Sequence, residues 1–517
     1  MARLALLSVS DKTGIVDFAR TLVERHDYQI VSSGGTAKTL QEAGIPVTKV
    51  SEHTGAPEIL GGRVKTLHPR IHGGILARTD LESDRDELTQ QDIPAIDLVV
   101  VNLYPFERTV AKNETTLAEA IEQIDIGGPT LVRAAAKNFS YVTVLTAPKQ
   151  YKGYLAEIAA RGTASLSFRF QCARAAFDRV LHYDCAISEY LAGQHIEAGA
   201  SPETPPFVIH AVPHQSLRYG ENPQQEATWY RSTGEPTGWA GAEQLQGKEL
   251  SYNNLVDLEA ARAISSDFLG DAQCCAVVIK HTNPCGIAVG DTPEAAYRRA
   301  LAGDPVSAFG GIVAISQPID AATASALTET FLECVVAPGC GAAARPILAN
   351  KKNLRVLILP DFACGPNRSV KAIAGGYLAQ QADNRPINPE DWKVVTQKQP
   401  TELDWQDLVF AWKACKHVKS NAIVIVNAGQ TIGIGAGQMN RVGAANIALA
   451  QAGDKVRGAV LASDGFFPFG DSVTAAAQAG IRAVIQPGGS IRDPESVAAA
   501  DAAGIAMICT GTRHFLH

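Results

Sequence analysis

The 517-residue sequence has no long apolar run, no pair of cysteines at the C-x-x-C spacing and no excess of positive charge. No stretch approaches the ~20 consecutive apolar residues that cross a bilayer, and the apolar segment near the N-terminus is too short for a secretory signal. We therefore expect a cytoplasmic protein without membrane partners. The net charge of −7 gives no general attraction for nucleic acid. Any anionic ligand must be held by local cations and backbone N–H groups.

Ten cysteines occur without a C-x-x-C pair, the spacing typical of structural zinc sites and thioredoxin-like redox motifs. We therefore expect neither kind of site. Cys172, Cys185 and Cys274 lie within apolar or helical patterns. Reduced core thiols are the simplest interpretation of these three residues.

The length indicates two to four domains. The polar, proline-rich segment 195–206 is the best candidate for a boundary. A weak internal repeat follows it, because residues 276–290 resemble residues 422–437 as hairpin-like pairs of apolar strands, each followed by a helical pattern. We predict domains at residues 1–198, 199–372 and 373–517.

The N-terminal region alternates strand and helix patterns. Residues 3–9 predict a strand, which a loop rich in Ser and Lys joins to a helical pattern over residues 15–25. The unit repeats with a strand at 29–31, a Ser-Gly loop, a helix at 37–43 and a strand at 47–50. Two such units predict a parallel α/β sheet with a ligand beyond the carboxyl ends of its strands. Each loop alone could be a helix cap, but two in succession favour an anion site.

Further polar loops follow the next predicted strands. The glycine-rich, basic segment 61–69 is either a surface turn or a site for a phosphate or carboxamide. A strand at 97–101 ends in polar residues. Asp125 precedes a helix predicted over residues 131–138 and is most simply its N-cap. Lys137 lies roughly 12 Å along that helix from Pro129, so it shares a site with Asp125 only if its side chain reaches back.

A reactive pair ends a buried strand in the second half. Residues 276–279 predict that strand, Lys280 and His281 follow it, and Asn283 with Pro284 predicts a turn. A cation beside a base that works near neutral pH suits chemistry, although a solvated pair before a turn is equally consistent with these residues. The second copy of the repeat has no such pair.

Two other segments have more than one interpretation. Arg218 and Tyr219 before Gly220 offer a forked donor and a stacking ring, or form a surface turn. The run 433–438 fails the dinucleotide-binding pattern because Gln438 replaces its last glycine. We expect it to allow close backbone approach, to another chain or to a flat ligand.

These segments together resemble a known family. The loops similar to an inosine monophosphate (IMP) cyclohydrolase domain are residues 8–14, 33–36, 62–69, 102–106, 124–128 and 136–138. The motifs similar to an aminoimidazole carboxamide ribonucleotide (AICAR) formyltransferase domain are residues 218–220, 280–286, 307–310, 419–422, 434–441 and 466–469. Both sets occur in this order in the bifunctional purine-biosynthesis family.

The resemblance implies an α/β fold, with an N-terminal methylglyoxal-synthase-like parallel-sheet domain followed by two cytidine-deaminase-like α/β subdomains. Zinc deaminases need an H-x-E motif and a P-C-x-x-C motif. Here Pro284 and Cys285 have no partner cysteine. We therefore expect no catalytic metal, and we interpret Cys285 as a small turn residue.

The resemblance also implies the last two steps of de novo purine biosynthesis. A formyl group passes from 10-formyltetrahydrofolate, a co-substrate, to the 5-amino group of AICAR, and dehydrative ring closure then gives IMP. The expected partners are nucleotides, folate and a second copy of the chain, in a homodimer with formyl-transfer sites at the subunit interface. A zinc-dependent nucleoside deaminase and a non-catalytic nucleotide sensor are the alternatives. Bound zinc would indicate the first, and ligand-induced stabilisation without turnover the second.

For formyl transfer, the resemblance implies that His281 is the base, that Lys280 supplies the cation or the proton, and that Asn421 holds the carboxamide. The residues expected on the nucleotide are Arg218, Tyr219, Phe309, Gly310, Glu333, Arg441 and Arg513. Phe466 and Ser490 are expected on the folate side. Two positions depart from the family pattern there, since Gly465 and Gly470 stand where alanine and arginine are expected.

For ring closure, the expected acid–base and oxyanion groups are Lys65, Tyr104, Asp125 and Lys137. The residues expected to bind the substrate and its phosphate are Ser10, Lys12, Ser33, Gly34, Gly35, Thr36, Arg63, Thr66, Asn102, Ile126 and Gly127.

Overall fold

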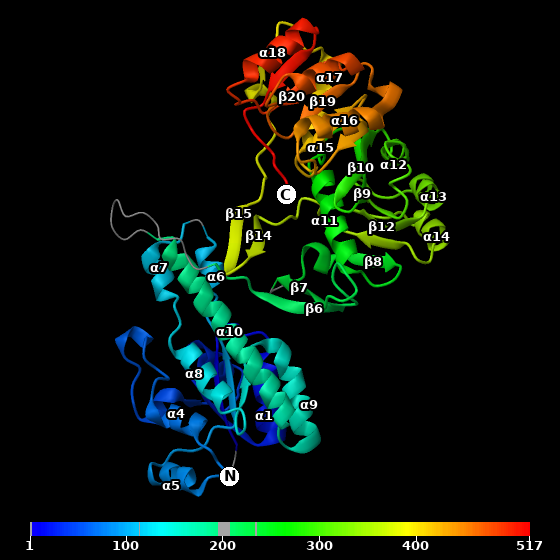
Figure 1. Cartoon of the computed structure of the whole chain (residues 1–517). Helices are drawn as coiled ribbons and strands as arrows, with labels where there is room; N and C mark the ends of the chain where they lie inside the picture. Colours follow the sequence, from blue (N-terminus) through cyan, green and yellow to red (C-terminus); the bar gives the residue numbers. More distant parts are fainter. Residues whose placement is uncertain (1–2, 113, 195–206, 233–234) are drawn as a thin grey trace. The chain divides into compact units, whose positions relative to one another are not determined.

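The computed structural model describes residues 3–112, 114–194, 207–232 and 235–517. Contacts divide the chain into two compact units, Met1–His210 and Ala211–His517 (Figure 1). The predicted linker 195–206, with the boundary at residue 198, lies outside the described residues. The boundary predicted at residue 372 falls inside strand β14 (Arg368–Ile373). The three-domain division stays a prediction.

The first unit contains a parallel sheet, as predicted. Its described strands follow the order β3-β2-β1-β4-β5, and every neighbouring pair is parallel. These strands are β1 (Arg3–Val9), β2 (Tyr28–Ser32), β3 (Thr48–Lys49), β4 (Leu98–Asn102) and β5 (Thr143–Leu145). The central strands are apolar runs buried almost throughout, because helices cover both faces of a parallel sheet. The strand order reverses between β1 and β4, and their carboxyl ends therefore open a crevice suited to ligands.

The helices of this unit form two packed groups. Helix α1 contacts both α2 and α9, and α8 packs against both α4 and α10. The helices are α1 (Ile15–His26), α2 (Gly34–Glu42), α3 (Val50–Thr54), α4 (Pro69–Leu76), α5 (Glu82–Gln90), α6 (Phe106–Val110), α7 (Leu117–Glu122), α8 (Gly127–Lys137), α9 (Tyr151–Arg161) and α10 (Leu166–Ala192). Helices α2 and α8 begin earlier than predicted, at glycines that the sequence interpretation assigned to loops. Their free N-terminal N–H groups consequently belong to those glycine segments.

The second unit contains a repeated sheet. Within residues 235–517 one sheet has the order β10-β9-β11-β12-β13-β8, and the other has the order β18-β17-β19-β20-β21-β16. In both sheets an antiparallel hairpin is followed by one antiparallel pairing, two parallel pairings and an antiparallel edge strand. The matched strand directions confirm the internal repeat. Its likeness to cytidine deaminases stays a prediction.

The strands of the first sheet are β8 (Glu243–Gln246), β9 (Cys274–Lys280), β10 (Asn283–Gly290), β11 (Gly311–Ile315), β12 (Leu332–Ala337) and β13 (Arg355–Ile358). Those of the second are β16 (Lys393–Val394), β17 (Ile423–Val426), β18 (Thr431–Gly435), β19 (Val460–Ser463), β20 (Ala483–Gln486) and β21 (Ala506–Cys509). Separate hairpins pair β6 (Ala211–Leu217) with β7 (Ala227–Ser232), and β14 with β15 (Gly376–Gln381).

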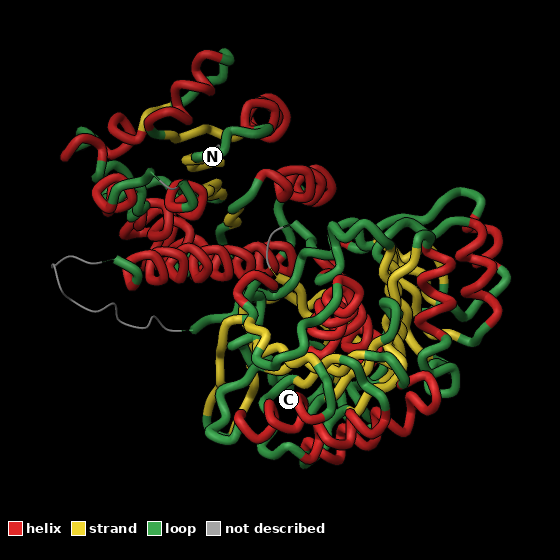
Figure 2. Tube along the Cα trace, turned by 90° about the horizontal axis from the view of Figure 1, so that it is seen from above, coloured by secondary structure: helices red, strands yellow, loops and turns green. Residues whose placement is uncertain are grey.

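In the second unit, helices and sheets alternate in layers (Figure 2). Helices α11 (Tyr252–Ser266) and α15 (Glu402–Cys415) share one core with the facing sides of both sheets. The outer face of the first sheet packs on α12 (Pro293–Leu301), α13 (Ala321–Glu329) and α14 (Ala344–Ala349). The outer face of the second packs on α16 (Arg441–Ala452), α17 (Asp471–Ala479) and α18 (Asp493–Ala502). None of the described helices is long and apolar enough to cross a membrane.

The turn predicted at Asn283 and Pro284 is wrong. The chain reverses two residues earlier, at His281 and Thr282, whose φ angles are +52° and +64°. Asn283 already begins β10, where Pro284 pairs with Ile279 next to a bulge. A proline fits this position because it needs no backbone donor at an irregular pairing near the end of an edge strand.

The expected partner of the glycine run 433–438 is also wrong. A Cβ on Gly433 would lie 2.1 Å from the carbonyl oxygen of Ala448, and one on Gly435 would lie 2.0 Å from that of Ala444. The close approach is therefore to α16 of the same chain. The first copy repeats the arrangement, since a Cβ on Gly286 would lie 1.9 Å from the carbonyl oxygen of Ala300 in α12.

Candidate functional site

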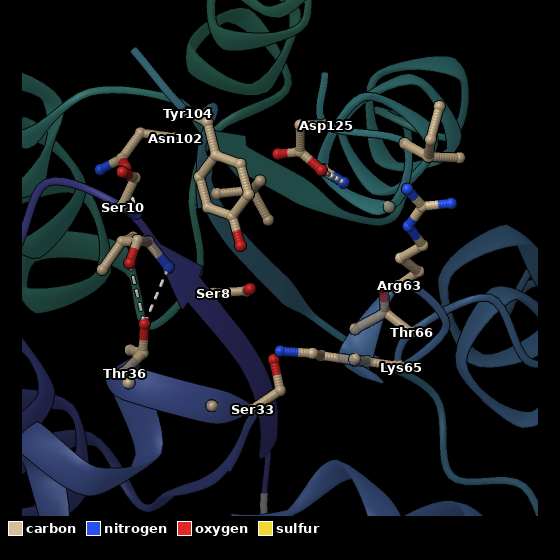
Figure 3. A pocket seen from close by; sticks show the side chains of 18 of the residues that line it. Ser8, Ser10, Ser33, Thr36, Arg63, Lys65, Thr66, Asn102, Tyr104 and Asp125 are labelled. Atoms are coloured by element: carbon tan, nitrogen blue, oxygen red, sulfur yellow. Dashed lines mark hydrogen bonds between the residues drawn. The ribbon is translucent and has the colours of Figure 1, made fainter. Parts of the chain in front are cut away.

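A cavity of about 750 Å³ opens at the carboxyl ends of β1 and β4 in the first unit (Figure 3). It brings together most of the residues expected to serve ring closure. The predicted residues that line it are Ser10, Lys12, Ser33, Gly34, Gly35, Thr36, Arg63, Lys65, Thr66, Asn102, Tyr104, Asp125, Ile126 and Gly127. The polar side chains come from loops that are far apart in the sequence and that the sheet order places together.

One wall of the cavity is fixed by the end of β1. The Thr36 hydroxyl accepts the Val9 N–H and donates to the Val9 carbonyl, both at 3.0 Å. Lys12 Nζ donates to the same carbonyl at 2.6 Å. Burial lowers the pKa of Lys12, an effect that neighbouring Asp11 opposes. This wall presents an ammonium beside the N-terminus of α2, an arrangement suited to a phosphate.

Glycines make room for Lys65 on the opposite wall. A Cβ on Gly62 would lie 2.8 Å from Lys65 Cε, and one on Gly34 would lie 3.4 Å from Lys65 Nζ. The ammonium lies 3.5 Å from Glu58. Arg63 forms an ion pair with Glu122 at the rim. These two glycines thus let the Lys65 side chain enter the cavity from the segment 61–66.

Asp125 is held at the first turn of α8. Its carboxylate accepts the Gly128 N–H at 2.8 Å, although Ile126 occupies the N-cap position itself. A Cβ on Gly128 would lie only 2.2 Å from Asp125 Oδ2, and one on Gly127 would lie 2.9 Å from Thr66 Oγ1. Burial raises the pKa of Asp125, and the N–H hydrogen bonds oppose that rise. A carboxyl that retains its proton more readily than usual suits acid–base work.

Lys137 is separated from the other predicted residues. It is the last residue of α8, ten positions beyond Gly127, or about 15 Å along the helix. Its side chain is exposed, and Lys137 does not belong to the described lining of the cavity.

In the second unit, the β9–β10 hairpin brings Lys280 to Phe309 and Gly310. Lys280 Nζ donates to the carbonyl oxygens of Phe309 at 2.9 Å and Gly310 at 3.2 Å. Gly310 has a φ of +68° and donates its N–H to Phe331. His281 is exposed at the tip of the hairpin.

Glu333 and the loop that follows Tyr219 both contact the start of α11 in the second unit. Glu333 accepts a hydrogen bond from the Asn254 side chain at 3.0 Å. The neighbouring Asn253 donates to the loop that follows Tyr219, at the carbonyl of Glu221. The Arg218 guanidinium stacks on the Tyr219 ring, with 4.6 Å between its carbon and the ring centroid.

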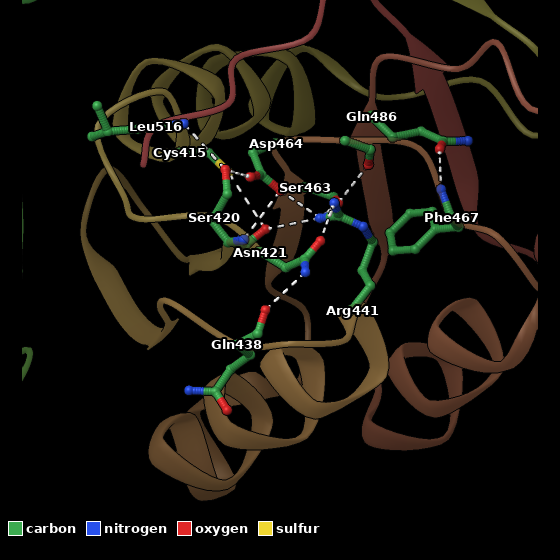
Figure 4. A network of polar contacts seen from close by, with 12 residues as sticks. Cys415, Ser420, Asn421, Gln438, Arg441, Ser463, Asp464, Phe467, Gln486 and Leu516 are labelled. Carbon is green, nitrogen blue, oxygen red and sulfur yellow. Dashed lines mark hydrogen bonds and ion pairs between the residues drawn. The ribbon is translucent and has the colours of Figure 1, made fainter. Parts of the chain in front are cut away.

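Asn421 and Arg441 belong to one buried polar network (Figure 4). Arg441 donates to Asn421 Oδ1 at 2.7 Å and to Ser463 at 2.8 Å, and it forms an ion pair with Asp464. Asn421 Nδ2 donates to the Gln438 carbonyl at 2.8 Å. The Asn421 amide is therefore fixed in orientation by two partners before any substrate binds.

Lys419, two residues before Asn421, contacts the β9–β10 hairpin, since its N–H donates to Asn283 Oδ1 at 3.1 Å. Phe466, Ser490 and Arg513 lie in loops of the second sheet. Among the described residues, no hydrogen bond or ion pair joins these three to Lys280 or His281.

Comparison with known proteins identifies the family. The family model of the AICARFT/IMPCHase bienzyme matches residues 135–451, and that of the MGS-like domain matches residues 14–130. The chain belongs to the AICARFT/IMPCHase bienzyme family. Proteins named "Bifunctional purine biosynthesis protein PurH" are 62% identical in Synechococcus elongatus, 61% in a Cyanothece species and 60% in a Synechocystis species. Each match covers 100% of both chains.

A crystal structure of ForH is 36% identical and covers 37% of this chain and 100% of its own, with a TM-score of 0.34.

Two residues that hold predicted site residues in place were not predicted from the sequence. Tyr183 on α10 accepts the Asp125 N–H at 2.7 Å and donates to the Gln123 carbonyl at 3.0 Å. Asp464 is the buried partner of Arg441. Neither lies in a motif, and Tyr183 is 58 positions from Asp125. A departure from the family pattern also gains a reason here: a Cβ on Gly465 would lie 2.6 Å from the Arg441 guanidinium and 2.7 Å from the Phe515 ring.

The structure corrects the interpretation of Cys285. It lies in β10 rather than in a turn, and burial raises the pKa of its thiol to about 12. A neutral, buried thiol is a poor nucleophile and a poor metal ligand. Within the described residues, no group of three or more His, Cys, Asp or Glu side chains is arranged to hold a metal ion.

Proposed function

We propose that the protein catalyses the last two steps of de novo purine biosynthesis, with formyl transfer to AICAR in the second unit and ring closure to IMP in the first. The family match and the full-length similarity to PurH proteins carry this conclusion. The geometry of the two groups of residues supports a separate role for each unit.

Formyl transfer requires an amine whose lone pair is delocalised into the imidazole ring to attack a formyl carbon. We assign His281 as the base that removes the amine proton, a role worth typically 10²–10⁴-fold in rate. Lys280 supplies positive charge to the oxygen that becomes negative in the tetrahedral intermediate. Two of the three N–H donors on Lys280 Nζ already bond to Phe309 and Gly310. The third remains for the substrate, in an orientation that these two bonds fix.

Asn421 orients the carboxamide of AICAR in this proposal. Its own amide is held by Gln438 and Arg441, so it is organised before the substrate arrives. We assign Arg218, Tyr219 and Glu333 to the nucleotide as well. The remaining assignments are Phe309, Gly310, Arg441 and Arg513 to the nucleotide, and Phe466 and Ser490 to the folate.

Ring closure requires an anchored phosphate and proton transfer at the carboxamide nitrogen and the departing oxygen. Lys12 and the N-terminus of α2 form the phosphate end of the cavity. Lys65, Tyr104 and Asp125 extend into the same space (Figure 3). The raised pKa of Asp125 suits a group that gives a proton to departing water. Lys65 stabilises negative charge on the carboxamide oxygen.

The formyl donor is a folate, and we propose 10-formyltetrahydrofolate without a catalytic metal. The family resemblance also supports a cytoplasmic homodimer with formyl-transfer sites at the subunit interface. Sedimentation at micromolar concentration would test whether the protein is a dimer.

The direct experiment incubates the purified protein with AICAR and 10-formyltetrahydrofolate and follows IMP by chromatography. A parallel reaction supplies formyl-AICAR alone. IMP in both reactions supports the proposal, whereas IMP only from formyl-AICAR would remove formyl transfer from it.

A further inference from the structure

The turn that carries His281 has an uncommon backbone conformation. His281 and Thr282 both adopt positive φ angles, as a two-residue hairpin turn with mirror-image geometry requires. Glycine and asparagine are the residues preferred at these positions, whereas a β-branched threonine at positive φ is a genuine outlier. Such residues persist where surrounding contacts over-determine them.

Asp257 on α11 supplies such a contact. Its carboxylate accepts the Thr282 N–H at 2.7 Å. Within the hairpin, the His281 carbonyl accepts two hydrogen bonds, from the Thr282 hydroxyl at 2.6 Å and from the Asn283 side chain at 3.3 Å. Asp257 lies outside the hairpin, so its hydrogen bond to Thr282 fixes the turn relative to α11.

The internal repeat provides an independent second example. On α15, Asp407 accepts the N–H groups of Ala428 and Gly429, at 3.0 and 2.7 Å, in the turn of the β17–β18 hairpin. Ala428 and Gly429 also have positive φ angles, +51° and +67°. Ala428 is therefore the structural counterpart of His281 in the second copy. When residues 276–290 are aligned with 422–437 by sequence, the residue matched to His281 is instead Asn427, one position earlier.

The two aspartates occupy the same place on equivalent helices. Each is six residues after its N-cap, Ser251 in α11 and Thr401 in α15, and each helix begins with a capping box. The repeat thus preserves an aspartate that holds the hairpin turn. In the second copy the held turn presents alanine and glycine, whereas in the first it presents His281 and a strained threonine.

We propose that Asp257 is a positioning residue for formyl transfer, whose bond to the Thr282 N–H holds the His281 turn in its reactive orientation. The inference rests on the proposed role of His281. Burial raises the pKa of Asp257, while the Thr282 N–H and the nearby charges of His281 and Lys280 oppose that rise.

The test removes and then restores the acceptor. Asp257→Ala should lower kcat for formyl transfer about a hundredfold, the loss that a displacement of about 1 Å causes, with an unchanged KM for AICAR. Asp257→Asn keeps an oxygen that accepts the Thr282 N–H and should recover most of this loss. Adding Thr282→Gly to Asp257→Ala should also recover activity, because glycine adopts the turn without support.

Asp407→Ala is the matched control. It removes the equivalent acceptor and also one of the carboxylates that pair with Arg482, at 2.9 Å, so it should lower the melting temperature yet keep kcat for transfer. Ring closure of added formyl-AICAR should stay at the wild-type rate in every variant, because the cavity proposed for it lies in the first unit.

Full transfer kcat in Asp257→Ala, or an equal kcat loss in Asp407→Ala, would overturn the inference. The proposed function fails separately, when the wild-type protein itself transfers no formyl group.

Discussion

The hydroxyl of Tyr183 should control ring closure without touching the substrate. It is fully buried on α10 and holds the segment before α8 at two points, the Asp125 N–H and the Gln123 carbonyl. Burial raises the pKa of Tyr183 to about 12, so the hydroxyl keeps its proton at physiological pH. Tyr183→Phe removes both hydrogen bonds and leaves the ring in place.

The magnitude follows from the groups left behind. A buried donor or acceptor without a partner costs about 1–3 kcal/mol. Two such groups would cost about 2–6 kcal/mol, and the lower end applies here because the segment borders the cavity, where water can reach it. A shift of about 1 Å in Asp125 would lower kcat for ring closure about a hundredfold.

The assay follows ring closure of added formyl-AICAR, together with urea unfolding of the protein. Tyr154→Phe is the matched control, because its buried hydroxyl bonds to Tyr28 at 2.7 Å and does not belong to the described lining of the cavity. It should lose comparable stability but keep ring closure. Wild-type kcat in Tyr183→Phe, or equal kcat losses in both variants, would refute the positioning of Asp125 by α10.

Other predictions concern the division of labour and the response to acid. His281→Ala should abolish formyl transfer and leave ring closure of added formyl-AICAR intact, whereas Lys65→Ala should do the converse; retained transfer in the His281 variant would refute its assignment as the base. Burial alone would raise the pKa of Asp267, but the hydrogen bond from His417 and the charges of His417 and Lys416 lower it to about 2. Ionised Asp267 therefore stabilises the folded protein by about 2 kcal/mol above pH ~4, and this contribution is lost as the pH falls toward ~2. Asp267→Asn should remove that stabilisation at pH 7 and flatten the acid limb of the stability profile, as measured by urea unfolding across pH.

Local patterns predicted much of the first unit. Buried parallel strands are continuous apolar runs, and the residues of its cavity lie in short glycine-rich loops after those strands, so sequence reasoning found both. It misplaced the start of α2, because Gly34 and Gly35 are typical of a loop although they form the first turn of the helix. The early start is tolerated because the first N–H groups of a helix need no partner within it.

The remaining features depend on tertiary contacts. Asn283 and Pro284 give a strong turn signal, yet the turn forms at His281 and Thr282 because Asp257 holds it. Arg441 was expected to bind the nucleotide, and its buried pairing with Asp464 could not be inferred from their separation in the sequence. Such pairings follow from strand order, which single-sequence patterns do not specify.

If each unit carries out one of the two consecutive reactions, two variants that each lack one activity should complement each other. The most direct measurement mixes the His281→Ala and Lys65→Ala proteins with AICAR and 10-formyltetrahydrofolate and follows IMP. We expect no IMP above background from either variant alone and steady IMP formation from the mixture, because formyl-AICAR made by one variant is closed by the other. A mixture that makes no IMP, or a single variant that makes it at the wild-type rate, would contradict the account.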